Sequence, residues 1–251
     1  MTQPPLDGGD VPAPGLTFKV SGLRAVLHLA EPVLTGLKFV RLVSSLGAWA
    51  SRLSNDPRIL PSELADDDIP LVLWRSPGNE WQCEVRRRRI DLMWRLGSPD
   101  GAAVVPAEFY GESVEAFLTI LESTKQRPTA LGSILERYSP CAGSAAMTLA
   151  RHFCNADAVT RPGPIYRSDT FMLSSHKVFA MHGIRVNSWV HNKSARLSNS
   201  NQDIVLVTTD INTIRPGNKE AQQPLDLKSF FVNSVATSAE VVQLYYRGSA
   251  V

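Results

Sequence analysis

Apolar and polar residues alternate with a period of two along residues 81–96, and the phase of this alternation changes once. Trp81, Cys83 and Val85 occupy odd positions, whereas Ile90, Leu92, Trp94 and Leu96 occupy even ones. Because successive side chains of a strand point to opposite faces of a sheet, the change requires a turn or a bulge. We predict a hairpin with Arg86 to Arg89 at its tip. Since the tip lacks an Asn-Gly or Asp-Gly pair, one long bulged strand is the alternative.

The same pattern predicts the other strands. Residues 16–29 alternate with a change of phase at Gly22, which indicates a strand with a glycine bulge. Residues 69–74 are a short apolar run between turn residues, as in a buried strand. Further strands are expected over residues 131–138, 170–173, 178–181, 184–190 and 203–214.

Apolar residues that recur every three or four positions predict four helices. They cover residues 37–53, 111–124 (with Ser113 as a cap), 144–153 and 225–246. Strands joined by hairpins pair antiparallel, because parallel neighbours need a crossover each time. The sequence therefore predicts an α+β fold, with a mostly antiparallel sheet covered by helices.

The domain organisation follows from the proline and glycine content. Residues 1–15 are rich in both and are predicted to be a disordered lead-in. Residues 16–251 are expected to form a single α+β domain. Pro162-Gly163-Pro164 breaks the chain, which makes residues 155–167 the candidate sub-domain boundary. No internal sequence repeat is evident.

Composition places the chain among soluble globular proteins. It is 43% hydrophobic and 20% charged, and no apolar run approaches the roughly 20 residues that span a bilayer. The N-terminus lacks the pattern of a secretory signal. The odd set of cysteines, Cys83, Cys141 and Cys154, argues against a disulfide framework and favours a reducing cytoplasm. We expect a cytoplasmic protein without a membrane partner.

Charge singles out one stretch. A net charge of +2 does not mark a general nucleic-acid binder, so any such binding must be local. Arginine forks suit phosphate oxygens, and Arg86, Arg87, Arg88 and Arg89 are the candidate nucleic-acid or anion site. The alternative is an exposed turn whose charge serves solubility.

The sequence gives little support for catalysis. The five histidines lack the spacing of a zinc site, and the acidic stretch with Glu63 and Asp66 to Asp68 is typical of a solvated loop. Nucleophile-elbow, phosphate-loop and dinucleotide motifs are missing from the sequence. We expect no metal and no cofactor, and we assign no catalytic residue. A hydrolytic site that pairs His176 or His191 with Asp203 or Asp210 stays an alternative.

Two resemblances add to this. The tail IVLVTTDINT, followed by a loop and SFFVNSVATSAEVVQLYY, resembles the end of a sporadically distributed bacterial family of uncharacterised α+β proteins. The resemblance covers about the last fifth of the chain, and it implies an accessory or defence-related gene. The first half is similar in element order to a ferredoxin-like unit, as in RNA-processing CRISPR endonucleases. Those enzymes carry a glycine-rich loop near the C-terminus, where this chain has only Gly217 and Gly248.

Together these observations favour a non-catalytic binding or scaffolding subunit of a cytoplasmic bacterial assembly. The large apolar residues Trp49, Trp74, Trp189 and Tyr246 suggest more contact area than a core requires, so we expect a protein partner or a homo-oligomer. The alternative is an RNA- or DNA-binding protein that uses the arginine hairpin.

Overall fold

The computed structural model describes residues 15–33, 39–54, 56–60, 69–98, 101–160, 162, 165, 167–197, 200–214 and 224–247. Apart from Gly15, the predicted lead-in of residues 1–15 lies outside the described residues. The acidic stretch from Glu63 to Asp68 also lies outside them, as do Gly163 and Pro164 of the predicted boundary.

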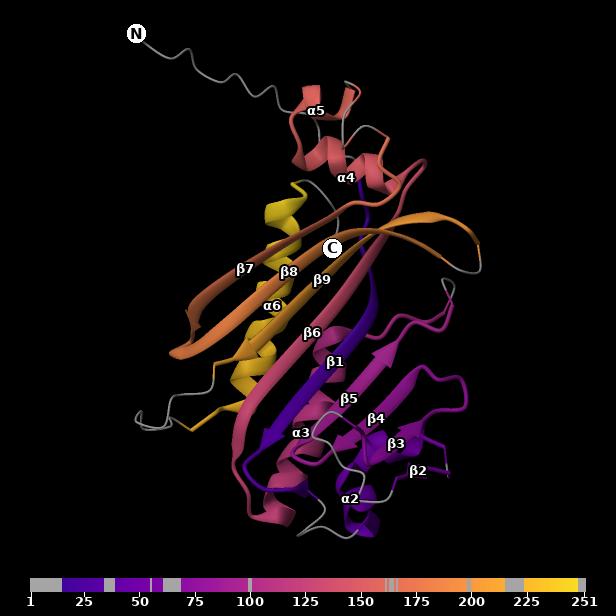
Figure 1. Cartoon of the computed structure of the whole chain (residues 1–251). Helices are drawn as coiled ribbons and strands as arrows, with labels where there is room; N and C mark the ends of the chain where they lie inside the picture. Colours follow the sequence, from indigo (N-terminus) through magenta and orange to yellow (C-terminus); the bar gives the residue numbers. More distant parts are fainter. Residues whose placement is uncertain are drawn as a thin grey trace.

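One nine-stranded antiparallel sheet organises the molecule, with the strand order β2-β3-β4-β5-β1-β6-β9-β8-β7 (Figure 1). This confirms the predicted α+β class. The strands on both sides of residues 155–167 belong to this sheet. The bounds are β1 Lys19–Leu29, β2 Arg58–Ile59, β3 Val72–Arg75, β4 Trp81–Arg86, β5 Arg89–Arg95, β6 Pro128–Pro140, β7 Met172–Met181, β8 Ile184–Arg196 and β9 Asp203–Thr213.

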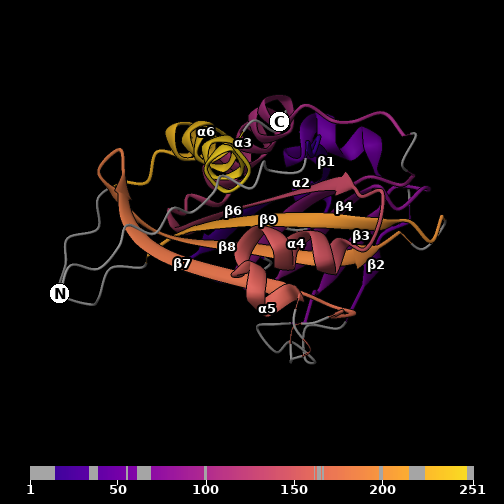
Figure 2. The ribbon, with the colours of Figure 1, turned by 90° about the horizontal axis from the view of Figure 1, so that it is seen from above.

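Helices gather on one side of the sheet, where Figure 2 shows α2, α3 and α6. Tyr110 of α3 stacks on Phe231 of α6, with ring centroids 5.2 Å apart. The last turn of α6 meets α4, since the His152 ring stacks on Tyr246 at 5.0 Å. The bounds are α2 Phe39–Ser45, η1 (a 3₁₀ helix) Gly47–Arg52, α3 Pro106–Thr124, α4 Ala145–Phe153, α5 Ala156–Thr160 and α6 Leu227–Tyr245.

The core lies between this side of the sheet and the helices. Leu23, Ala25 and Leu27 of β1 are almost fully buried there. The predicted irregularity near Gly22 is present, because the β1–β6 register shifts between Val20 and Gly22. The shift lets Phe18 also reach the helix side, where it packs against Tyr246.

The second half of the chain repeats the topology of the first. After β1, a three-stranded meander (β3, β4, β5) returns beside β1 and leads into α3. After β6, the meander β7, β8, β9 returns beside β6 and leads into α6 in the same way. The sheet therefore has approximate two-fold topology about the β1–β6 pair. In the first half, β1, α2, β4–β5, α3 and β6 follow one another as strand, helix, hairpin, helix and strand, with β2 and β3 added. The resemblance to a ferredoxin-like unit stays a prediction.

Several predicted element bounds were wrong. Helix α3 begins at Pro106, and Ser113 is no cap, because its hydroxyl donates to the Phe109 carbonyl inside the helix. Gly47, with φ of +52°, separates α2 from η1 within the predicted helix 37–53. The two short strands predicted over residues 170–181 are one strand, β7. It lies at the edge of the sheet, so most of its residues are exposed and its apolar alternation is weak.

Candidate functional site

One face of the sheet carries most of the charge of the strands. Residues paired in adjacent strands point to the same side, so the register assigns each side chain to a face. We call the side away from α2, α3 and α6 the open face, since these three helices all lie on the other side of the sheet (Figure 2). Its cations are Lys19, Arg24, Arg58, Arg75, Arg86, Arg89, Arg95, Arg185 and Lys193, and its carboxylates are Glu84, Asp91, Glu136 and Asp210.

Cations therefore exceed carboxylates by five on the open face, whereas the whole chain has a net charge of +2. The opposite face of the strands carries only three cations and one carboxylate: Arg137, Lys177, Arg196 and Asp203. The open face is thus the basic surface of the sheet.

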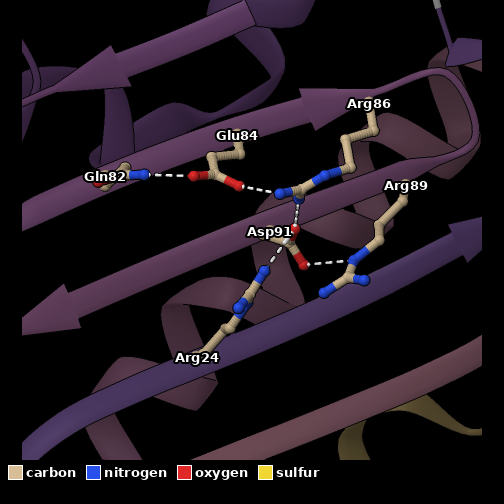
Figure 3. A network of polar contacts seen from close by, with 6 residues as sticks. All are labelled: Arg24, Gln82, Glu84, Arg86, Arg89 and Asp91. Carbon is tan, nitrogen blue, oxygen red and sulfur yellow. Dashed lines mark hydrogen bonds and ion pairs between the residues drawn. The ribbon is translucent and has the colours of Figure 1, made fainter. Parts of the chain in front are cut away.

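An arginine cluster lies on β4, β5 and β1 of the open face, around Asp91 (Figure 3). The Asp91 side chain has no solvent exposure. Its Oδ2 accepts a hydrogen bond from Nη2 of Arg24 at 3.0 Å and another from Nη1 of Arg86. Its Oδ1 accepts one from Nε of Arg89 at 2.9 Å. One carboxylate from β5 thus fixes three guanidinium groups from three strands.

A second carboxylate extends this cluster to the next strand. Glu84 of β4 forms an ion pair with Nη2 of Arg86, and it accepts a hydrogen bond from the amide of Gln82 (Figure 3). Guanidinium groups held by carboxylates lose less conformational freedom when they meet a further anion. The cluster is therefore preorganised, although part of its charge is neutralised.

The hairpin that was predicted to carry four arginines is present between β4 and β5, so the alternative of one bulged strand is wrong. However, only Arg87 and Arg88 form the turn, because Arg86 pairs with Arg89 inside the ladder. The turn is also attached to the chain after β1: the Arg88 carbonyl accepts from the amide of Leu29 at 2.9 Å, and the Arg87 carbonyl accepts from that of Val33 at 2.8 Å. The four residues therefore contribute to two different surfaces.

An aromatic cluster lies at the β7 edge of the open face, on β7 and β8. The Trp189 side chain is 40% exposed. The His176 ring lies 4.2 Å from it at 23°, and the His191 ring lies 6.1 Å from it at 6°, so the three rings are almost parallel. Ser174 Oγ contacts Nδ1 of His191 at 2.8 Å, and Asn187 Oδ1 contacts Nε2 of His176 at 3.3 Å. These contacts orient both imidazoles.

One cross-strand row joins the two clusters. Trp189 pairs with Asp210 of β9, Asp210 pairs with Ile134 of β6, and Ile134 pairs with Arg24 of β1. At about 4.8 Å per strand, Trp189 and Arg24 are roughly 14 Å apart, and β8 and β4 roughly 24 Å. A hollow of about 80 Å³ lies beside this row, where Gly22 provides no side chain.

Asp210 is the carboxylate next to the aromatic cluster. Burial raises its pKa, while the hydrogen bond from the Asn212 amide acts in the opposite direction. The positive charges of His191, Arg24 and Arg89 also oppose the rise. Because the net effect is a raised pKa, Asp210 holds its proton to a higher pH than an exposed aspartate does.

The residues of the hydrolytic alternative are only partly brought together. His176, His191 and Asp210 share the open face, but Asp203 points to the opposite face. There its Oδ1 accepts from Nε of Arg196 at 2.9 Å, and its Oδ2 accepts from the amide of Ala145 at the start of α4. These contacts lower the pKa of Asp203. Asp203 is therefore a structural residue that orients α4, and its pairing with either histidine was wrongly predicted.

Three of the four large apolar residues that suggested surplus contact area belong to the core. Trp49, Trp74 and Tyr246 are buried, so these three offer no contact surface. Trp189 is the exception.

Metal-binding clusters and membrane-spanning helices were also sought. Within the described ranges, no three histidine, cysteine, aspartate or glutamate side chains come together in a way that could hold a metal ion. None of the helices in this part of the chain is long and apolar enough to cross a membrane.

No protein-family model matches the chain, and no curated protein matches it. The two family resemblances therefore stay predictions. What the molecule can do has to be inferred from its own surfaces, of which the open face is the most distinctive.

Sequence reasoning missed most of this site. Arg24, Arg75, Arg95 and Lys193 each stand alone in the sequence, and only the strand register brings them to one face. The alternation inside each strand was the available signal, since cations recur at positions opposite to the buried ones.

Proposed function

We propose that the protein is a non-catalytic nucleic-acid-binding protein whose open face contacts the sugar-phosphate backbone. The observation that carries the proposal is the excess of cations on the open face of the sheet, whereas the whole chain is nearly neutral. Phosphate contacts from arginine and lysine supply most of the affinity in non-specific nucleic-acid binding. A nine-stranded sheet offers a long surface for such contacts.

The two kinds of cation on this face have different roles in the proposal. Arg24, Arg86 and Arg89 are held by Asp91, so they present fixed guanidinium edges rather than full charges. Arg75 and Arg95 lie on the same face and are exposed. These exposed side chains supply most of the attraction for phosphates.

The experiment measures binding of fluorescein-labelled 12-nucleotide RNA and DNA, single-stranded and duplex, by fluorescence anisotropy at 50 and 200 mM salt. The open-face variant is Arg75→Gln, Arg95→Gln and Lys193→Gln. The matched control removes the same charge elsewhere, from exposed residues of three helices or helix ends: Lys125→Gln, Arg151→Gln and Lys228→Gln.

We expect the wild-type protein and the control variant to bind with the same steep salt dependence. The slope of log affinity against log salt is negative, and each phosphate contact to a single strand contributes about −0.7 to it. The open-face variant lacks three cations, so its slope should be shallower than that of the wild type by about 2. Absence of salt-dependent binding by the wild-type protein would exclude the proposal. Equal losses in the two variants would locate binding outside the open face.

A separate variant tests the arginine hairpin. Arg87 and Arg88 lie in the turn with exposed side chains. If Arg87→Gln and Arg88→Gln together weaken binding as much as the open-face variant does, the turn belongs to the interface. Unchanged binding assigns the turn to solubility.

A second candidate function is that of a subunit in an assembly, and helix α6 favours it. This 19-residue helix has only two charged residues, Lys228 and Glu240. Val232 and Leu244 on its outer side are 61% and 75% exposed. Exposed apolar residues on a weakly charged helix are typical of a protein-contact surface. Light scattering of the wild-type protein and of the Val232→Glu, Leu244→Glu variant tests this, since a homo-oligomer should dissociate in the variant.

The proposal includes a cytoplasmic bacterial setting. Cys83, Cys141 and Cys154 are all free thiols, which supports a reducing compartment. A role in defence or in a mobile element is the part of the proposal that rests on the family resemblance alone.

A further inference from the structure

The aromatic cluster of His176, Trp189 and His191 is the part of the open face that the charge argument does not use. Trp189 is 40% exposed and lies on the open face between exposed apolar residues of β7, such as Met172, and polar residues such as Asn187 and Lys193. Its nearly parallel neighbours and their polar contacts hold the indole in a defined orientation. Because the His176 ring already stacks on the indole, another flat group can stack only on the part of the ring that stays exposed.

Resting on the proposed function, we propose that Trp189 stacks on an unpaired base, so that the open face selects single-stranded over duplex nucleic acid. Bases in a duplex are stacked and paired, whereas the bases of a single strand can be splayed onto aromatic side chains. The base would lie at the β7–β8 end of the face. The backbone would continue along the row toward Arg24, roughly 14 Å away.

The charges around the cluster agree with this occupant. Lys193 lies on the open face of β8, two residues beyond His191, so it can meet a phosphate next to the stacked base. Asp210 is the carboxylate beside Trp189, and burial raises its pKa, so it holds its proton to a higher pH than an exposed aspartate does. The indole is apolar, so stacking contributes no charge and adds nothing to the salt dependence. It also recognises no particular base, because every base has a π face.

The test compares Trp189→Ala and Trp189→Phe with the wild-type protein. The probes are a 12-nucleotide single-stranded RNA, the same RNA as a duplex, and an abasic 12-nucleotide strand with the same number of phosphates. The matched control is Met172→Ala, because Met172 is an exposed apolar residue on the open face of β7. Circular dichroism establishes that each variant is folded.

We expect Trp189→Ala to weaken binding of the single strand roughly 5- to 100-fold, as when one base loses its aromatic partner. The salt slope should not change, because no phosphate contact is lost. Trp189→Phe should retain most of the affinity. The duplex and the abasic strand should bind wild type and Trp189→Ala equally, and Met172→Ala should bind all three probes as wild type does.

The outcomes separate this inference from the proposed function. If wild type binds all three probes with salt-dependent affinity but Trp189→Ala binds the single strand as tightly as wild type does, the stacking proposal is wrong. The proposed binding of nucleic acid by the open face is then retained. Equal loss on the single strand and the abasic strand would also overturn stacking, because the tryptophan would then act without a base. If wild type binds none of the probes, the proposed function fails, and the inference fails with it.

Discussion

Asp91 on β5 accepts a hydrogen bond from Arg24 on β1 at 3.0 Å, across a sequence separation of 67 residues. The contact joins the meander of the first half to the central strand pair. It also shows how a buried carboxylate can shape a basic surface, since Asp91 is inaccessible while the arginine remains 26% exposed. The buried Asp91 carboxylate therefore both links β5 to β1 and fixes the position of a partly exposed positive charge.

Replacement of Asp91 by asparagine should destabilise the protein by about 3 kcal/mol. Breaking a buried ion pair costs about 3–5 kcal/mol, and the lower end applies because the three arginines can partly turn to water. Glu84→Gln is the control, since Glu84 meets only one of these arginines and should cost about 1 kcal/mol. Urea unfolding at pH 7 measures both. If the two variants lost the same free energy of unfolding, Asp91 would not be the residue that holds the arginine cluster together.

Gly132 of β6 should not tolerate a side chain. A Cβ atom there would lie 2.5 Å from Oδ1 of Asn212 and 3.2 Å from Cβ of Val26. Overpacking of this kind costs about 1–3 kcal/mol, so Gly132→Ala should lower the midpoint of thermal unfolding by several degrees.

Gly111 is the matched control, because it lies inside α3 with nothing within 4 Å of an added Cβ. Gly111→Ala should stabilise the protein by about 0.5–1 kcal/mol, as alanine has the better helix propensity. Adding Asn212→Ala to Gly132→Ala should recover part of the loss. A neutral Gly132→Ala variant would show that β6 and β9 are less tightly packed than described.

Local pattern predicted much of this fold, and the reasons are visible in individual residues. Trp81 and Val85 on β4, and Ile90 and Trp94 on β5, recur at every second position because one side of each strand faces the core. Edge strand β7 lacks that constraint, so its central residues were missed. Alternation of apolar and polar residues arises where one face of a strand is buried, so it does not predict a strand whose two faces are both exposed.

The candidate site was less predictable, because it depends on register. Arg86 to Arg89 attracted notice as a run, yet the structure divides the run between the turn and the open face. Arg24 and Trp189 lie far apart in the sequence and are joined through Asp210 and Ile134 only by strand order. Local periodicity gives the face of a residue within its strand, but it does not give the neighbouring strand.

The three cysteines should differ in reactivity. Cys83 is buried, and burial raises its pKa well above that of an ordinary thiol, with the charges of Asp91 and Glu84 acting in the same direction. Burial also raises the pKa of Cys141, which is only partly covered. Since the thiolate is the reactive form, we expect Ellman's reagent at pH 8 to modify Cys154 first and Cys141 more slowly.

Cys83 should react only after unfolding in guanidinium chloride. Raising the pH from 8 to 9.5 should speed the modification of Cys141 and leave Cys83 unreactive in the folded protein. The Cys83→Ser variant identifies the third thiol, because its native reaction should be unchanged and its unfolded reaction should lose one equivalent. Modification of Cys83 in the folded protein would contradict the burial of β4.

Asp210 and Asp203 should have opposite effects on the pH dependence of stability. The raised pKa of Asp210 means that the folded state binds its proton more tightly than the unfolded state does. Its contribution is therefore fully present below the unfolded value, near 3.9, and is lost as the pH rises through the folded pKa. Asp210→Asn removes this loss, so the variant should be more stable than wild type at pH 7 and similar to it near pH 3.

Asp203 has a lowered pKa, because Arg196 and the amide of Ala145 bind its ionised form. Its contribution is present above the unfolded value and disappears as the pH falls through the folded pKa. Asp203→Asn should therefore be less stable than wild type at pH 7, with the difference vanishing at low pH. Urea midpoints for both variants between pH 3 and 7 check the two signs. The contrary outcome would be an Asp210→Asn variant that is less stable than wild type at pH 7. In that case Arg24 and His191 would stabilise the ionised Asp210 carboxylate by more than burial destabilises it. These two positive side chains would then be less available to an anion on the open face.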